Sequence, residues 1–229
     1  MEEKCWLYDR CNHKDCEKDF CLRKYKLDYL YNESNLSADQ RVKIKLSADA
    51  DHTDEEEFAK LAYIEEHIEG FVASHKKLYL HSSICGNGKT SWAIRLINAY
   101  LNKVWAGCAL ECKAIFINVP RFLNSLKLNM SGFDAYAPHV REALPTADLV
   151  VWDDIAAKNG SEYDIDQLLT LIESCNNKSV VYTTNLNRSE LARAVDSRIT
   201  SRICGSDYEI ELHGADKRVL KSYNNQGGH

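Results

Sequence analysis

The sequence predicts an α/β fold in which helices cover both faces of a parallel sheet. From residue 77 onward, short apolar stretches alternate with segments of helical periodicity. The apolar stretches contain few polar residues, a composition typical of strands buried on both faces of a parallel sheet. The first stretch runs into a glycine-rich loop and then a helix, which is the order found in phosphate-binding units.

Five short apolar runs are expected to form the strands: 78–82, 114–119, 148–154, 179–185 and 208–214. Helices are expected between them, because apolar residues recur there every three or four positions: 90–104, 120–128, 164–175 and 187–203. Pro120 suits the first turn of its helix, where the missing N–H removes no hydrogen bond.

The chain ahead of the sheet divides into a head and a connector. Residues 1–30 are rich in cysteine, aromatic residues and charge but poor in aliphatic residues, so we expect something other than an apolar core to hold them. Residues 31–76 form a polar connector and a helix, which begins near Thr53 with an acidic first turn. Residues 77–229 form the α/β domain.

Composition restricts location and partners. The chain has 229 residues, a net charge of −5 and no apolar run that approaches the ~18 residues of a membrane-spanning helix. No apolar segment follows the charged start, so no secretory signal is expected. We therefore expect a cytoplasmic protein with no membrane partner and with reduced cysteines. The negative charge gives no overall attraction to nucleic acid, so such binding needs a local surface or an assembly.

The loop after the first strand carries most of a phosphate-binding motif. Gly88, Lys89 and Thr90 match the end of G-x-x-x-x-G-K-[ST], but Ser83 stands where the first glycine is expected. In such loops backbone N–H groups bind phosphate, the lysine reaches the β- and γ-phosphates, and the threonine binds Mg²⁺. The expected nucleotide contacts are Ser83, Gly86, Asn87, Gly88, Lys89, Thr90 and Ser91. Serine is unfavourable at position 83 only where the backbone needs a positive φ.

Two carboxylates end the third expected strand. Asp153 and Asp154 follow the loop by one strand–helix–strand interval, and parallel strands bring their carboxyl ends to one edge. Asp153 is predicted to contact the nucleotide and to bind Mg²⁺ with Thr90, and Asp154 to orient or deprotonate an attacking water. Asn185, after the fourth strand, is predicted to contact the γ-phosphate or that water. Either motif alone can be a simple turn, but both in this order predict a nucleotide site.

Three arginines complete the candidate site. Arg198 and Arg202 lie four positions apart, on one face of the expected helix. Such a pair is often plain surface charge, but in a ring-forming ATPase it would reach the neighbouring subunit's nucleotide and stabilise transition-state charge. Arg218, after the last strand, is a weaker candidate for a phosphate contact.

Residues 77 to 218 resemble the AAA+ ATPases, specifically the DnaC/DnaI type of bacterial and phage helicase loader. The resemblance rests on "GNGKT" as Walker A, "VVWDDI" as Walker B, "VVYTTN" as sensor 1 and "SRITSRI" as the arginine-finger box. It implies Arg202 as the finger, with Arg198 as second choice, and Arg218 as a sensor-2 residue. It also implies an ATPase that uses ATP and Mg²⁺, assembles as a homo-oligomer with ATP or helicase, and loads a DnaB-type helicase onto single-stranded DNA.

Three features depart from the family pattern. Ser83 replaces a glycine, and Asp154 replaces the usual glutamate. Because aspartate is one methylene shorter than glutamate, Asp154 implies slower, switch-like hydrolysis. The tail after the last strand is short, so little or no C-terminal lid is expected.

The head carries candidate zinc ligands. Tetrahedral zinc takes four thiolate or imidazole ligands and can fold a segment that lacks a core. We expect the ligands to be Cys5, Cys11, Cys16 and Cys21, with His13 as an alternative to Cys11 or as its hydrogen-bond partner. The spacing matches no common zinc-finger pattern, and reduced structural cysteines are the alternative. The resemblance implies a phage-encoded loader whose zinc head contacts the helicase.

Other functions fit parts of the same pattern. An IstB-like ATPase accessory to a transposase would share the fold and differ in its partner. A small-molecule P-loop kinase would need an acceptor pocket and a basic lid, and neither is recognisable here. A decoy of the host loader would bind nucleotide without hydrolysis.

Overall fold

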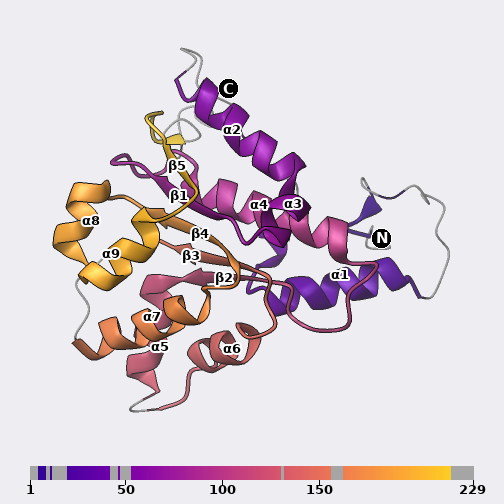
Figure 1. Ribbon diagram of the computed structural model, residues 1–229. Coiled ribbons are helices and arrows are strands. Elements are labelled where there is room, and N and C mark those ends of the chain that lie inside the picture. Colours follow the sequence, from indigo (N-terminus) through magenta and orange to yellow (C-terminus); the bar gives the residue numbers. More distant parts are fainter. Residues whose placement is uncertain are drawn as a thin grey trace, which may run out of the picture.

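A parallel sheet forms the centre of the molecule. The computed structural model describes residues 5–8, 11, 20–41, 46, 53–129, 132–155 and 162–217. Its five strands are all parallel, in the order β2-β3-β4-β1-β5 (Figure 1). They are β1 (Lys77–His81), β2 (Ala114–Asn118), β3 (Leu149–Asp153), β4 (Ser179–Thr184) and β5 (Tyr208–Glu211). The α/β class and the five expected strands are confirmed.

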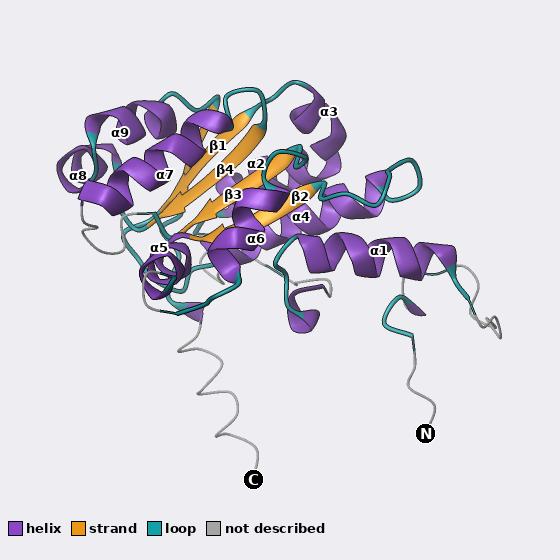
Figure 2. Cartoon of the chain, turned by 90° about the horizontal axis from the view of Figure 1, so that it is seen from below, coloured by secondary structure: helices purple, strands orange, loops and turns teal. Residues whose placement is uncertain are grey.

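Helices cover the sheet on both faces (Figure 2). In the described residues they are α1 (Leu22–Glu33), α2 (Glu55–Glu66), α3 (Ile68–Ala73), α4 (Lys89–Val104), α5 (Val119–Leu128), α6 (Tyr136–Ala143), α7 (Glu162–Ser174), α8 (Arg188–Ala194) and α9 (Ser197–Cys204), with a 3₁₀ turn η2 (Ala38–Arg41). None of them is long and apolar enough to span a membrane.

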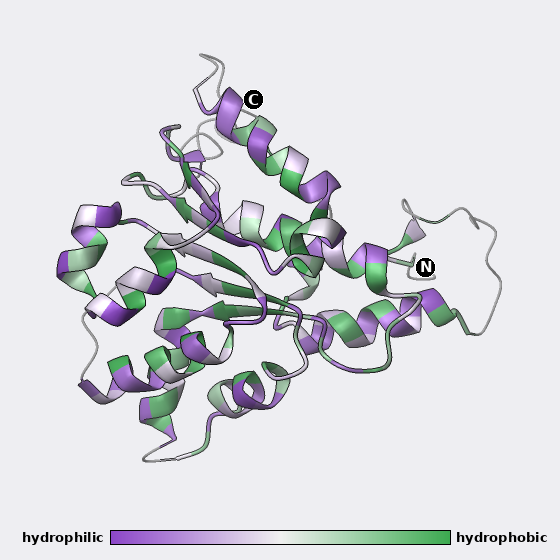
Figure 3. Ribbon diagram, in the orientation of Figure 1, coloured by the Kyte–Doolittle hydropathy of each residue, from purple (hydrophilic) through white to green (hydrophobic). Residues whose placement is uncertain are grey.

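Alternation along the strands creates two apolar cores, because successive strand residues point to opposite faces. On β3, Leu149 and Val151 join the core beneath α1 to α4, whereas Val150 and Trp152 join the core beneath α5 to α9. The helices accordingly carry both apolar and polar residues along their length, as the mixed colours in Figure 3 show. This packing fixes the strands whose carboxyl ends carry the candidate site.

Helix α1 differs from what the sequence predicts for the head. Leu27, Leu30 and Tyr31 have no exposed surface and share one face of α1, and this helix contacts α4 and β2. Leu7 is also buried, and the Trp6 indole donates a 2.8 Å hydrogen bond to Asp28. An apolar core therefore does hold the described part of this segment. A few apolar residues suffice because they complete a core that α4 and β2 already form.

Three other helical segments differ in detail. The segment 187–203 forms two helices, because Val195 is extended and the Asp196 carboxylate then accepts the Arg198 N–H and begins α9. Helix α6 was not expected. The residue before α2 is Asp54 rather than Thr53, with a φ of 68°. Its carboxylate accepts N–H groups from the chain that follows β5 instead of capping α2.

Candidate phosphate-binding site

A cavity of about 550 Å³ opens at the carboxyl edge of the sheet. In open α/β sheets this edge is where ligands bind. The cavity is lined by Leu46, Cys85, Gly86, Gly88, Lys89, Thr90, Ser91, Asn118, Asp153, Asp154, Thr183, Thr184, Asn185 and Lys217. The glycine loop, the acidic end of β3 and the amide after β4 thus meet in one place, as the order of the motifs predicts.

The loop between β1 and α4 is held in shape by a buried serine. Ser82 has no exposed surface, and its hydroxyl accepts hydrogen bonds from the Ile84 N–H (3.0 Å) and the Asn87 amide (2.6 Å). Gly86 and Gly88 have φ values of 76° and 113°, in the left-handed region that favours glycine. Ser82 was not predicted, because its role depends on where the loop folds back and the motif leaves that position free.

Ser83 fits this loop without strain. The described residues other than glycine with a positive φ are Asn35, Asp54, His75 and Asp154, so Ser83 is not among them. Ser83 is also exposed. The position therefore has no need of glycine's conformational freedom in this chain.

The Lys89 ammonium lies inside the loop. Its Nζ donates to the Ile84 carbonyl (2.9 Å) and lies 3.3 Å from the Asn87 side-chain oxygen, and the residue is only 7% exposed. A buried cation held by neutral acceptors is a binding group for an anion, because a phosphate oxygen would replace a weaker acceptor.

The magnesium candidates contact each other. The Thr90 hydroxyl donates a 2.9 Å hydrogen bond to Asp153, which also accepts from Thr183 (2.6 Å) and lies 3.5 Å from the Asn118 amide. Burial raises the pKa of Asp153, while the hydroxyl donors Thr183 and Thr90 lower it. A carboxylate beside a hydroxyl is the hard oxygen donor set that Mg²⁺ prefers, so these residues fit the ion. Asn118 and Thr183 are site residues that the sequence motifs did not indicate.

Asp154 has a strained backbone. Its φ is 62°, and its N–H donates a 3.0 Å hydrogen bond to the Thr183 hydroxyl. Non-glycine residues in this conformation concentrate at functional sites. Asp154 and Asn185 both line the cavity, so a carboxylate and an amide face the space next to the phosphate loop.

The chain after β5 crosses the phosphate loop. The Lys217 N–H donates to the Gly86 carbonyl (3.1 Å), and the Asn87 amide donates to the Leu212 carbonyl (3.2 Å). A Cβ at Gly86 would collide with the Asp216 carboxylate. Lys217 lines the cavity, so this segment, residues 212–217, forms part of its wall, and the sequence had indicated this tail only through Arg218.

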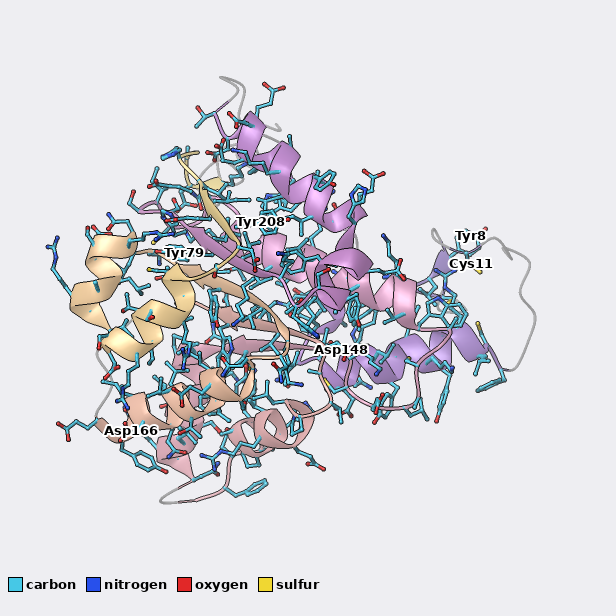
Figure 4. All side chains as sticks on the ribbon, in the orientation of Figure 1. Tyr8, Cys11, Tyr79, Asp148, Asp166 and Tyr208 are labelled. Carbon is cyan, nitrogen blue, oxygen red and sulfur yellow. The ribbon has the colours of Figure 1, made fainter. Side chains whose placement is uncertain are left out.

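Arg198 and Arg202 are not among the residues that line the cavity. Arg198 pairs with Asp196 (3.0 Å) and with Asp166 on α7 (3.6 Å; Asp166 is labelled in Figure 4). Arg202 pairs with Glu173 at 3.3 Å, and both arginine side chains are exposed. Their predicted action on a neighbouring subunit is compatible with this exposure but is not tested by it. Arg218 lies outside the described residues.

The zinc prediction falls partly outside the described residues, since Cys16 and His13 are not among them. Cys5, Cys11 and Cys21 are described, and the Cys21 thiol accepts the Lys24 N–H at the start of α1. Within the described part of the chain, no group of three or more His, Cys, Asp or Glu side chains is arranged to hold a metal ion.

Comparison with known proteins places the fold. No family model and no curated protein matches the chain. A DnaC helicase loader is 17% identical over 74% of this chain and 94% of its own, with a TM-score of 0.56. A DnaI structure is 20% identical over 82% of this chain and 93% of its own, with a TM-score of 0.56. The chain shares the fold of the DnaC loader and of DnaI.

The same fold occurs in longer replication proteins. AMPPCP-bound DnaA from Aquifex aeolicus is 15% identical over 80% of this chain, with a TM-score of 0.55. This chain spans 53% of that DnaA chain, and 50% of the chain of a DNA replication initiation factor. At these identities the likeness concerns the fold.

Proposed function

We propose that the protein is an ATPase that loads a DnaB-type replicative helicase onto single-stranded DNA. The nucleotide part rests on one observation: Thr90 and Asp153 are hydrogen-bonded at the floor of a cavity that also contains Lys89, Asp154 and Asn185. The choice of helicase as partner is supported by the likeness of fold to DnaC and DnaI.

Each residue has a defined part in the proposed hydrolysis. Lys89 exchanges the Ile84 carbonyl for oxygens of the β- and γ-phosphates. Thr90 and Asp153 would hold Mg²⁺, which would supply positive charge to neutralise the phosphates. Asp154 accepts the proton of the attacking water, which Asn185 orients.

Assembly belongs to the same proposal. Arg202, or Arg198 in its place, reaches the nucleotide of a neighbouring subunit in a homo-oligomer that forms with ATP or helicase. Slow hydrolysis in this arrangement suits a switch, located in the cytoplasm of a bacterial or phage-infected cell.

Co-purification with the replicative helicase tests the function. We expect the wild-type chain to retain helicase with ATP present, and Lys89→Ala to lose this dependence on ATP. Lys60→Ala is the control, because Lys60 is half exposed on α2, far in sequence from the loop. A wild-type chain that retains no helicase with or without ATP contradicts the loader function, and retention of a transposase instead supports an IstB-like role.

The zinc head is proposed separately. Metal analysis of the unchelated protein should give about one zinc per chain, since one tetrahedral site takes four of the five candidate ligands. Cys21→Ser should lower the zinc content, whereas Cys108→Ser, at a buried cysteine outside the head, should not. A wild-type chain without zinc contradicts this part of the proposal.

A further inference from the structure

Thr183, the fifth residue of β4, is hydrogen-bonded both to Asp153, the last residue of β3, and to Asp154, the residue after it. Its hydroxyl donates a 2.6 Å hydrogen bond to Asp153 and accepts the Asp154 N–H at 3.0 Å. Thr183 is only 1% exposed, so water does not readily substitute for either bond. One side chain thus contacts the magnesium candidate and the backbone of the candidate base.

The hydroxyl chemistry at this position is specific. A hydroxyl has one proton to donate and lone pairs to accept, and both capacities are used here. Valine has nearly the same shape as threonine but offers neither. A valine would leave the Asp154 N–H and one hydrogen-bonding position of Asp153 without this partner in a buried place.

The bond to Asp154 also supports a strained turn. Asp154 has a φ of 62°, which costs free energy in a residue that carries a Cβ. The next residue is fixed to the same strand: the Ile155 N–H donates to the Thr183 carbonyl (3.0 Å), and the Thr184 hydroxyl donates to the Ile155 carbonyl (2.7 Å). Strand β4 therefore holds the exit of β3 in the conformation that turns Asp154 toward the cavity.

We propose that Thr183 is a positioning residue, which sets both the magnesium carboxylate of Asp153 and the left-handed turn at Asp154. This inference rests on the proposed ATPase activity. It gives strand β4 a role in positioning the two Walker B carboxylates, Asp153 and Asp154.

The test compares Thr183→Val and Thr183→Ser with Ser179→Ala. Ser179 is a matched control, because it lies on the same strand, is fully buried and donates its hydroxyl to the Phe71 carbonyl (3.0 Å) at the opposite end of the sheet. For each variant, kcat and KM for Mg–ATP are measured, together with the Kd for ADP in EDTA and the melting temperature. Thr183→Ala removes the same hydroxyl and replaces the valine variant if valine prevents folding.

We expect Thr183→Val to lower kcat by about 10- to 100-fold, because a hydrogen bond to a charged group and the geometry of the base are lost together. The Kd for ADP without magnesium should stay within about twofold of the wild type, since Lys89 and the loop are unchanged. Thr183→Ser should recover most of kcat, and Ser179→Ala should lower the melting temperature while kcat stays near wild type.

Two failures are distinguishable. A wild-type chain that neither binds nor hydrolyses ATP contradicts the proposed function. An active wild type in which Thr183→Val changes kcat no more than Ser179→Ala does, or in which serine gives no recovery, contradicts the positioning role alone.

Discussion

The sequence singles out two regions, the candidate phosphate-binding site and the cysteine-rich head, and they lie toward opposite ends of helix α4. They differ in what fixes the positions of their residues. At the start of α4, the Thr90 hydroxyl donates directly to Asp153 of β3, which also accepts a hydrogen bond from Thr183 of β4. The far end of α4 is roughly 24 Å away, from its 16 residues at 1.5 Å each. Just after this end, the Ala106 carbonyl accepts a hydrogen bond from Lys26 of α1. Of the N-terminal cysteines, Cys11 lies toward that end, where Figure 4 labels it near Tyr8.

This difference has a physical cause. The sheet fixes the positions of residues at the ends of its parallel strands, because burial of both faces fixes the register of the strands. The described cysteines of the head, Cys5, Cys11 and Cys21, lie outside the strands, so the sheet does not fix their positions. Metal binding would have to fix them instead. A motif at a strand end is therefore a stronger prediction than a cluster of ligand residues in a loop.

The largest effect should come from the carboxyl edge. Asp154→Asn removes the proposed base but keeps its size, so kcat for ATP should fall about 100-fold or more. Nucleotide affinity should change by less than about threefold, because the substitution leaves Lys89 and the rest of the phosphate loop unchanged. Steady-state ATPase assays and nucleotide titration measure the two effects. Asp39→Asn, an exposed carboxylate on η2, should change neither; equal kcat for Asp154→Asn and wild type would exclude Asp154 as the base.

The second effect tests whether α1 belongs to the core. Leu30 is fully buried on α1, and Leu22 on the same helix is 54% exposed. Leu30→Ala should lower the free energy of unfolding by about 2–5 kcal/mol. Leu22→Ala should change it by about 0.5 kcal/mol or less. Denaturant unfolding checks both, and similar small effects for the two variants would show that α1 folds apart from the sheet.

The smallest effect concerns pH. Burial lowers the pKa of His81 at the end of β1, and the nearby carboxylates Glu211 and Glu209 oppose this shift. The folded state then binds the proton less readily than the unfolded state, so stability should be lost as the pH falls below the ordinary histidine pKa of 6.5.

His81→Gln should make the loss of stability between pH 7.5 and 5.5 smaller than in the wild type, measured by denaturant unfolding at each pH. Asp153 contributes to the pH dependence of stability with the opposite sign, because its raised pKa favours protonation in the folded state. This contribution is the same in the wild type and in the histidine variants, so it cancels when they are compared. His67→Gln, at an exposed histidine, is the control. An unchanged slope in His81→Gln would contradict the assignment.

Sequence patterns were sufficient for the sheet and for the position of the cavity. The five apolar runs, and the order of Lys89, Asp153 and Asn185 along them, follow from periodicity and from the rule that parallel strands share a carboxyl edge. Patterns were not sufficient for Ser82, Asn118 and Thr183, because ordinary polar residues become part of a site only through contacts between strands. They also failed for α1, whose buried residues complete a core built elsewhere in the chain.

The cavity has a thermodynamic consequence. Its lining comes from β2, β3 and β4, from the loop after β1 and the start of α4, and from the segment after β5, so it exists only when the whole sheet has formed. Any ligand that occupies it binds the folded chain and not the unfolded one, and by mass action it adds about 2.7 kcal/mol of stability at a hundred times its Kd. If this ligand is the proposed nucleotide, its removal would lower the stability of the folded chain by the same amount.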